Sequence, residues 1–148
     1  MKRIIFILPA IILFMFSCKS THKASAQTAT QKNMFVKETK WVMVSFHGKK
    51  PAEAGFRERV PYVVIDKEAG TISGNSGCNS FSGKAVIEGD KMKAERIAST
   101  KAFCMGVPES EFFADLSELN NLKTEDDKLI FLKEGKVIME FVAEPNKK

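Results

Sequence analysis

A glycine-rich stretch at residues 70–83 constrains the fold of this chain more than any other part of it. Its sequence is GTISGNSGCNSFSG, in which four of the fourteen residues are glycine and most of the others are Ser or Asn. Glycine is favoured where the backbone needs a positive φ, or where another chain passes too close for a Cβ atom. Because apolar residues (Ile72, Cys78, Phe81) alternate with the glycines, the stretch predicts two strands joined by a tight, bulged turn at Asn75–Gly77.

The same stretch lacks the features of a phosphate-binding loop. It has no Gly-Lys-Ser/Thr ending, and no GxGxxG pattern that leads into a helix with an acidic residue about twenty positions further on. We therefore expect these glycines to serve the backbone geometry, and we expect no cofactor.

Residues 1–17 have the features of an export signal. Lys2 and Arg3 precede an uncharged apolar run at residues 4–16, which is too short to span a bilayer comfortably but is typical of a signal-peptide core. The run ends in Met-Phe-Ser-Cys, with the cysteine at position 18, and this ending resembles the bacterial lipobox. We therefore expect Cys18 to be lipidated, with palmitate among its acyl chains, and to hold the protein at the membrane.

Two alternatives to lipidation are an uncleaved anchor and a soluble secreted protein. Ordinary cleavage would use the Ala-x-Ala pattern at residues 24–26, but this pattern lies well beyond the apolar run, with charged residues between. Lys19 is not the Asp that retains many lipoproteins at the inner membrane, so the expected location is the outer membrane, facing the periplasm. Residues 18–39 are polar and are expected to form a flexible tether.

The positive charge of the chain lies mostly outside the part that is expected to fold. The whole chain has a formal net charge of +5, yet residues 40–143 hold 15 Lys and Arg against 16 Asp and Glu. A domain so close to neutrality lacks the electrostatic footprint of a nucleic-acid-binding protein. We expect one monomeric domain over residues 40–143, a polar tail at residues 144–148 and no nucleic-acid partner.

Short β-favouring segments dominate this domain. Strands are expected at residues 41–47, 60–66, 70–88 (the glycine-rich pair), 92–97, 128–133 and 136–143, with another strand or corner at 99–104 and a polar loop at 48–58. The pattern predicts a mainly β fold with one helix, a small closed or nearly closed antiparallel barrel of about seven or eight short strands packed with a single α-helix.

The single helix is expected to begin near Pro108 and to end at Asn120–Asn121. Its apolar residues recur at helical spacing: Phe112, Phe113, Leu116 and Leu119. Asp115 and Glu118 are expected on the solvent side, and the early acids Glu109 and Glu111 are expected to be a solvated helix start.

An ordered set of residues in this domain is similar to a known family. It comprises Trp41, the run Ser73-Gly74-x-x-Gly77-Cys78-Asn79-x-Phe81-x-Gly83, Thr100 at the end of Ile97-Ala-Ser-Thr, Cys104, the Glu111-Phe-Phe helix and Leu129-x-x-Leu132. The set resembles the META domain family of HslJ-like bacterial envelope lipoproteins over about residues 40–142. The resemblance implies a lipocalin-like antiparallel barrel in an envelope protein associated with stress, and it carries over no catalytic residue.

Two cysteines, Cys78 and Cys104, remain beyond Cys18. An exported compartment is oxidising, so the two are candidates for a disulfide, and the alternative is a pair of buried free thiols. A zinc site would need four ligands, but the candidates are only these two cysteines and His47. The cysteines also do not form a Cys-x-x-Cys pair, so we expect no metal. A Cys–His hydrolase with His47 as base is also disfavoured, because apolar residues flank Cys104.

These observations together indicate a non-enzymatic, lipid-anchored envelope protein that presents a surface to an unknown protein or cell-wall partner. The alternative is a carrier that holds a small apolar ligand inside the barrel. A barrel of about eight strands is just wide enough to be filled by its own side chains. A continuous apolar cavity on the order of several hundred Å³ would instead favour the carrier.

Overall fold

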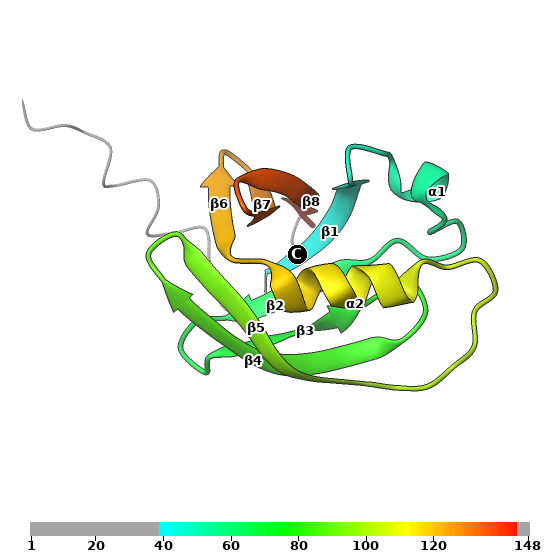
Figure 1. Cartoon of the computed structure of the whole chain (residues 1–148), viewed down its shortest axis with the longest axis horizontal. Coiled ribbons are helices and arrows are strands. Elements are labelled where there is room, and N and C mark those ends of the chain that lie inside the picture. Colours follow the sequence, from blue (N-terminus) through cyan, green and yellow to red (C-terminus); the bar gives the residue numbers. More distant parts are fainter. Residues whose placement is uncertain (1–38, 145–148) are drawn as a thin grey trace, which may run out of the picture.

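The computed structural model describes residues 39–144, and within them eight antiparallel strands close into a barrel. Each strand pairs with its neighbour in the sequence, and the last strand returns to pair with the first (Figure 1). The elements are β1 (Lys40–Phe46), α1 (Pro51–Ala54), β2 (Tyr62–Asp66), β3 (Thr71–Asn75), β4 (Ser80–Glu88), β5 (Lys91–Ser99), α2 (Glu109–Glu118), β6 (Asn121–Glu125), β7 (Lys128–Lys133) and β8 (Lys136–Ala143). The prediction of a small antiparallel β-barrel is confirmed.

The expected export signal, Cys18 and all but the last residue of the tether lie outside the described residues, as do residues 145–148 of the tail. In the part of the chain that the structure describes, no helix is both long enough and apolar enough to cross a membrane.

Side chains from the strands themselves fill the barrel. Inward and outward residues alternate in β1, where Trp41 and Met43 are buried between more exposed neighbours, whereas β7 buries four consecutive residues. The largest fully buried side chains are Trp41, Met43, Phe56, Ile72, Met92, Phe112, Leu116, Leu119, Leu129, Phe131, Met139 and Phe141. Since each large apolar side chain stabilises the fold by roughly 1.5–3 kcal/mol when buried, this core is the main source of stability.

The longer helix, α2, completes the core beside the weakest seam of the barrel. Strands β5 and β6 are joined through a single register pair, Lys91 with Asn121, whereas β4 and β5 pair along most of their length. Helix α2 packs against β5 and buries Phe112 and Leu116. Figure 1 shows it crossing between the β3–β5 part and the β6–β8 part of the barrel.

Two elements differ from the prediction because the sequence signal for each is weak. Within the expected loop at 48–58, Pro51 starts the one-turn helix α1, and Gly55 ends it in the left-handed conformation. Strand β6 was not expected, since its sequence NLKTE places only Leu122 in the core. Residues 100–104 form no strand and belong to the connection between β5 and α2.

One side chain of α2 points the other way from the prediction. Asp115 was expected on the solvent side with Glu118, but its exposed fraction is only 8%. Its carboxylate meets the imidazole of His47, which lies directly after β1, at 2.6 Å. A carboxylate is buried in this way when a polar partner replaces its water.

Candidate functional site

The glycine-rich stretch forms the β3–β4 hairpin, whose turn lies beside the first turn of α2. The two strands pair from Thr71 with Lys84 to Asn75 with Ser80. The Ser76 backbone N–H donates to the Asn79 carbonyl at 2.9 Å, which closes the turn at residues 76–79. The Gly77 N–H donates to the Asn75 side-chain oxygen at 2.9 Å, a local bond that stabilises the turn.

Two glycines of the motif are required by close approach. A Cβ atom on Gly74 would lie 2.0 Å from the carbonyl oxygen of Tyr62 on β2. A Cβ on Gly77 would lie 2.6 Å from the ring of Phe56, and the φ of Gly77 is +95°. The first contact lets β2 and β3 pair closely, and the second lets the turn rest on the core.

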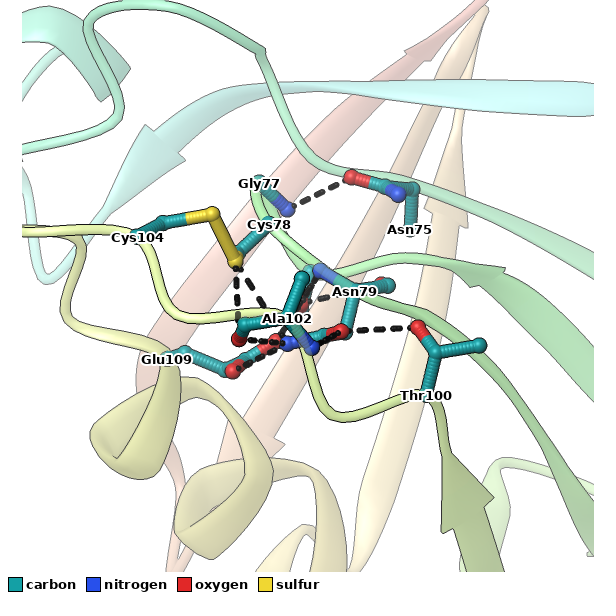
Figure 2. Close-up of a disulfide and its surroundings, with 9 residues drawn as sticks. Asn75, Gly77, Cys78, Asn79, Thr100, Ala102, Cys104 and Glu109 are labelled. Carbon is teal, nitrogen blue, oxygen red and sulfur yellow. Dashed lines mark hydrogen bonds between the residues drawn. A yellow bond between two sulfur atoms is a disulfide. The ribbon is translucent and has the colours of Figure 1, made fainter.

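Asn79 is a buried residue at the centre of a part-buried hydrogen-bond network (Figure 2). Its exposed fraction is 2%. Its Nδ2 donates to Oε2 of Glu109 at 2.8 Å and to the carbonyl of Ala102 at 3.0 Å. Its Oδ1 accepts from the Thr100 hydroxyl at 2.7 Å and from the Ala102 N–H at 2.7 Å. The side-chain amide therefore joins three segments: the hairpin turn, the chain after β5 and the start of α2.

Glu109 is part of this network and is not the solvated helix start that the sequence suggested. Its Oε1 accepts from the Asn79 backbone N–H at 3.1 Å and from the Ser76 hydroxyl. A carboxylate in the first turn of a helix also interacts favourably with the helix dipole. Glu109 thus fixes the N-terminus of α2 to the hairpin turn.

A covalent bond joins the hairpin turn to the chain after β5. Cys78 and Cys104 form a disulfide with a Cα–Cα distance of 5.9 Å and a sequence separation of 26 residues. Closing a loop of this length stabilises a fold by roughly 3–4 kcal/mol in the chain-entropy model. The bridged sulfurs carry no thiolate, so in this state neither cysteine can act as a nucleophile or as a zinc ligand.

The disulfide and Asn79 together brace a loop, residues 101–107, which we call the braced loop. Both backbone groups of Ala102 bond to Asn79, and Cys104 is held by its bridge. On either side of Cys104, Phe103 is 89% exposed and Met105 is 87% exposed. The apolar residues on both sides of Cys104 are visible in the sequence, but their exposure could not be predicted from it.

The remaining motif residues support the barrel. Phe81 is 5% exposed and packs edge-to-face against Phe112 and Phe113 of α2. A Cβ on Gly83 would lie 2.9 Å from the carbonyl oxygen of Glu95 on β5. His47 belongs to a different cluster, with Glu111 and Asp115.

Comparison with known proteins shows which family shares this arrangement. No curated protein matches the sequence significantly. Three solved structures share the fold: an NMR structure (19% identity, TM-score 0.56, covering 72% of this chain and 91% of the other), an NMR structure from Burkholderia xenovorans (15%, 0.55, 74% and 84%), and the crystal structure of a DUF4847 family protein from Bacteroides vulgatus ATCC 8482 (15%, 0.54, 75% and 96%). The sequence profile of the META domain matches residues 19–146, nearly the whole length. The chain therefore belongs to the META domain family.

Proposed function

We propose that this chain is a lipid-anchored, non-catalytic binding protein of the bacterial cell envelope, and that it contacts a protein partner through the braced loop. The observation that carries this proposal is the exposure of Phe103 and Met105 on a loop that Asn79 holds at Ala102 and the disulfide holds at Cys104. Exposed large apolar side chains that lie together on a soluble domain mark interaction sites more often than single ones do.

The composition of the loop suits protein recognition. Aromatic anchors contribute strongly at protein interfaces, and methionine adapts its shape to a partner surface. Because the disulfide and the Asn79 network already order the backbone, binding costs less conformational entropy than it would for a free loop.

The surroundings of the loop offer a place for a partner side chain. A hollow of about 520 Å³ lies between the braced loop and the segment after α1. It is lined by Gly55, Arg57, Glu58 and residues 103–107. One residue of each charge beside two apolar side chains is the arrangement of an interface with an apolar centre and a polar rim.

The location in the envelope rests on two further observations. The disulfide is of a kind that persists in oxidising compartments such as the periplasm. The lipobox-like sequence before Cys18 supports attachment of the chain through a lipidated cysteine. We propose the outer membrane, facing the periplasm, as its place.

The carrier alternative is less well supported, because side chains fill the barrel. Trp41, Phe131 and Phe141 are each at most 2% exposed inside it. A hollow of about 670 Å³ does lie beside β6, but charged residues contribute much of its lining: Lys67, Asp90, Lys123 and Glu125. A site for an apolar ligand would be enclosed and predominantly apolar.

Affinity capture from native membranes tests the proposal. The lipidated full chain should capture a partner protein, and the Phe103→Ser/Met105→Ser variant should capture at least about tenfold less of it. The reason is that burial of each large apolar side chain at an interface stabilises the complex by roughly 1.5–3 kcal/mol. Val137 on β8 is 46% exposed, so Val137→Ser serves as the matched control and should capture as wild type does. Equal capture by the double variant would contradict the proposal.

A further inference from the structure

A second group of polar side chains, separate from the Asn79 network, gathers beside α2. Glu111 and Asp115 lie one turn apart on the helix, so both carboxylates project from the same face. His47 follows β1 and faces them. Its backbone position is fixed, because its N–H donates to the Ile138 carbonyl at 2.9 Å and its neighbours Phe46 and Lys49 pair with each other.

The three side chains converge closely enough to hold one ion. Nε2 of His47 lies 2.6 Å from Oδ2 of Asp115 and 3.6 Å from Oε1 of Glu111, and all three ligand atoms lie within 4.8 Å of one another. With bonds of about 2.0–2.2 Å, neighbouring ligand atoms of a tetrahedral zinc ion are separated by roughly 3.3–3.5 Å. The His–Glu separation already fits this geometry, and the His–Asp separation needs to open by about 0.7 Å.

The side chains have the freedom to make this adjustment. The side chains of His47 and Glu111 are 39% and 59% exposed, so both can rotate. The side chain of Asp115 is only 11% exposed and supplies the fixed point of the cluster.

Charge also favours a cation at this place. Nε2 of His47 faces both carboxylates. As a metal ligand it would present its lone pair, with the ring proton on Nδ1, so that one ring nitrogen and two carboxylates converge on the same point. The nearby Lys133 has its ammonium bound to Glu118, and this hydrogen bond, followed by the charges of Glu118 and Asp115, raises its pKa. A divalent ion would neutralise both cluster carboxylates at once.

We propose that His47, Glu111 and Asp115 bind a single divalent transition-metal ion of the Zn²⁺ type. A mixed set of one imidazole and two carboxylates suits such ions, whereas Ca²⁺ and Mg²⁺ prefer oxygen ligands alone. Three protein ligands leave a fourth position open for water or a partner's side chain. The expectation of no metal considered only cysteine ligands with His47, and it did not include carboxylates 64 and 68 positions away in the sequence.

Calorimetric titration of the full chain with Zn²⁺, together with the visible absorption of bound Co²⁺, tests this site. Both measurements use a Cys18→Ser/His22→Ala background, because these two residues could bind metal independently. We expect one ion per chain and a Co²⁺ spectrum of tetrahedral type. His47→Ala and Glu111→Gln should each weaken binding at least about tenfold, since even the loss of an outer hydrogen-bond partner commonly costs 10–100-fold.

The control is Glu95→Gln, which removes an exposed carboxylate on β5 and should leave the affinity unchanged. Glu111 is itself exposed on the helix, so its variant is expected to fold, and a circular dichroism spectrum checks this. Absence of Zn²⁺ binding in the background protein would overturn the proposal. So would binding that survives both His47→Ala and Glu111→Gln.

Discussion

Replacement of Asn79 by Ala should destabilise the domain strongly. The side-chain amide makes four hydrogen bonds to Glu109, Thr100 and both backbone groups of Ala102. Its exposed fraction is 2%, so water does not reach it in the native fold. The substitution leaves these partners facing a small void at the junction of three segments.

The magnitude follows from the number of bonds. At a net contribution of about 1 kcal/mol each, four bonds give roughly 4 kcal/mol. Thr100 and Ala102 are exposed residues, so water can recover part of this amount, and Glu109 keeps its bonds from the turn. We therefore expect a loss of about 2–3 kcal/mol, a large share of the roughly 5–15 kcal/mol that holds a domain folded.

Urea denaturation with the disulfide intact measures this loss, and a thermal melt should show a decrease of at least about 10 °C. The matched control is Asn121→Ala, since that side chain donates one long, exposed bond of 3.5 Å to the Asp90 carbonyl. The control should change stability by less than about 0.5 kcal/mol.

A second variant, Asn79→Asp, tests the electrostatic part of the reasoning. It places a carboxylate against Glu109, and like charges raise the pKa of such a pair above the value of about 4 found in unfolded chains. Protons then bind the folded state more tightly than the unfolded state. The penalty is consequently full at neutral pH and is relieved as the pH falls through the raised pKa.

A loss of less than about 0.5 kcal/mol in Asn79→Ala, together with failure to capture the partner of the wild-type protein, would contradict the structural role of this side chain. Asn79 would then act as a ligand contact and not as a structural centre. A pH-independent penalty for Asn79→Asp would contradict the placement of Glu109.

Three further changes have defined outcomes. Cys78→Ser/Cys104→Ser should lower the free energy of unfolding by roughly 3–4 kcal/mol in urea, and an unchanged midpoint would show that the bridge adds nothing. Gly74→Ala should cost at least about 1–3 kcal/mol, because its Cβ would lie 2.0 Å from the Tyr62 carbonyl oxygen, and a melt like that of wild type would contradict this close approach. Cys18→Ser should release the protein from the membrane fraction, and full retention there would exclude lipidation as the anchor.

The barrel could be predicted from the sequence because most strands carry their own signal. Inward residues alternate in β1 and β2, and the glycine-rich hairpin has turn residues at its centre. Strand β6 lacks this signal, since Leu122 is its single buried residue, and its pairing with β7 is set by the barrel as a whole. Strand β6 therefore forms because of its tertiary contacts, which a local sequence pattern does not reveal.

Most residues of the site around Asn79 could be identified from the sequence, but the role of each residue could not. The resemblance to the META family included Cys78, Asn79 and Cys104, yet a sequence does not say which polar atoms face one another. Asp115 illustrates the limit: helical periodicity placed it toward solvent, and its partner His47 lies 68 positions away. Burial of a polar side chain depends on such a distant partner, so a periodic pattern cannot reveal it.

The network around Asn79 also bears on where the proposed partner would bind. Both hydrogens of its amide nitrogen and both lone-pair positions of its oxygen are used inside the protein. The side-chain amide of Asn79 therefore has no free donor or acceptor for a ligand. Asn79 positions the surface residues but does not itself contact a partner. The network orders the braced loop, where Phe103 and Met105 are the exposed large apolar side chains. A family that keeps the network and varies these two positions would keep one scaffold while changing its partner.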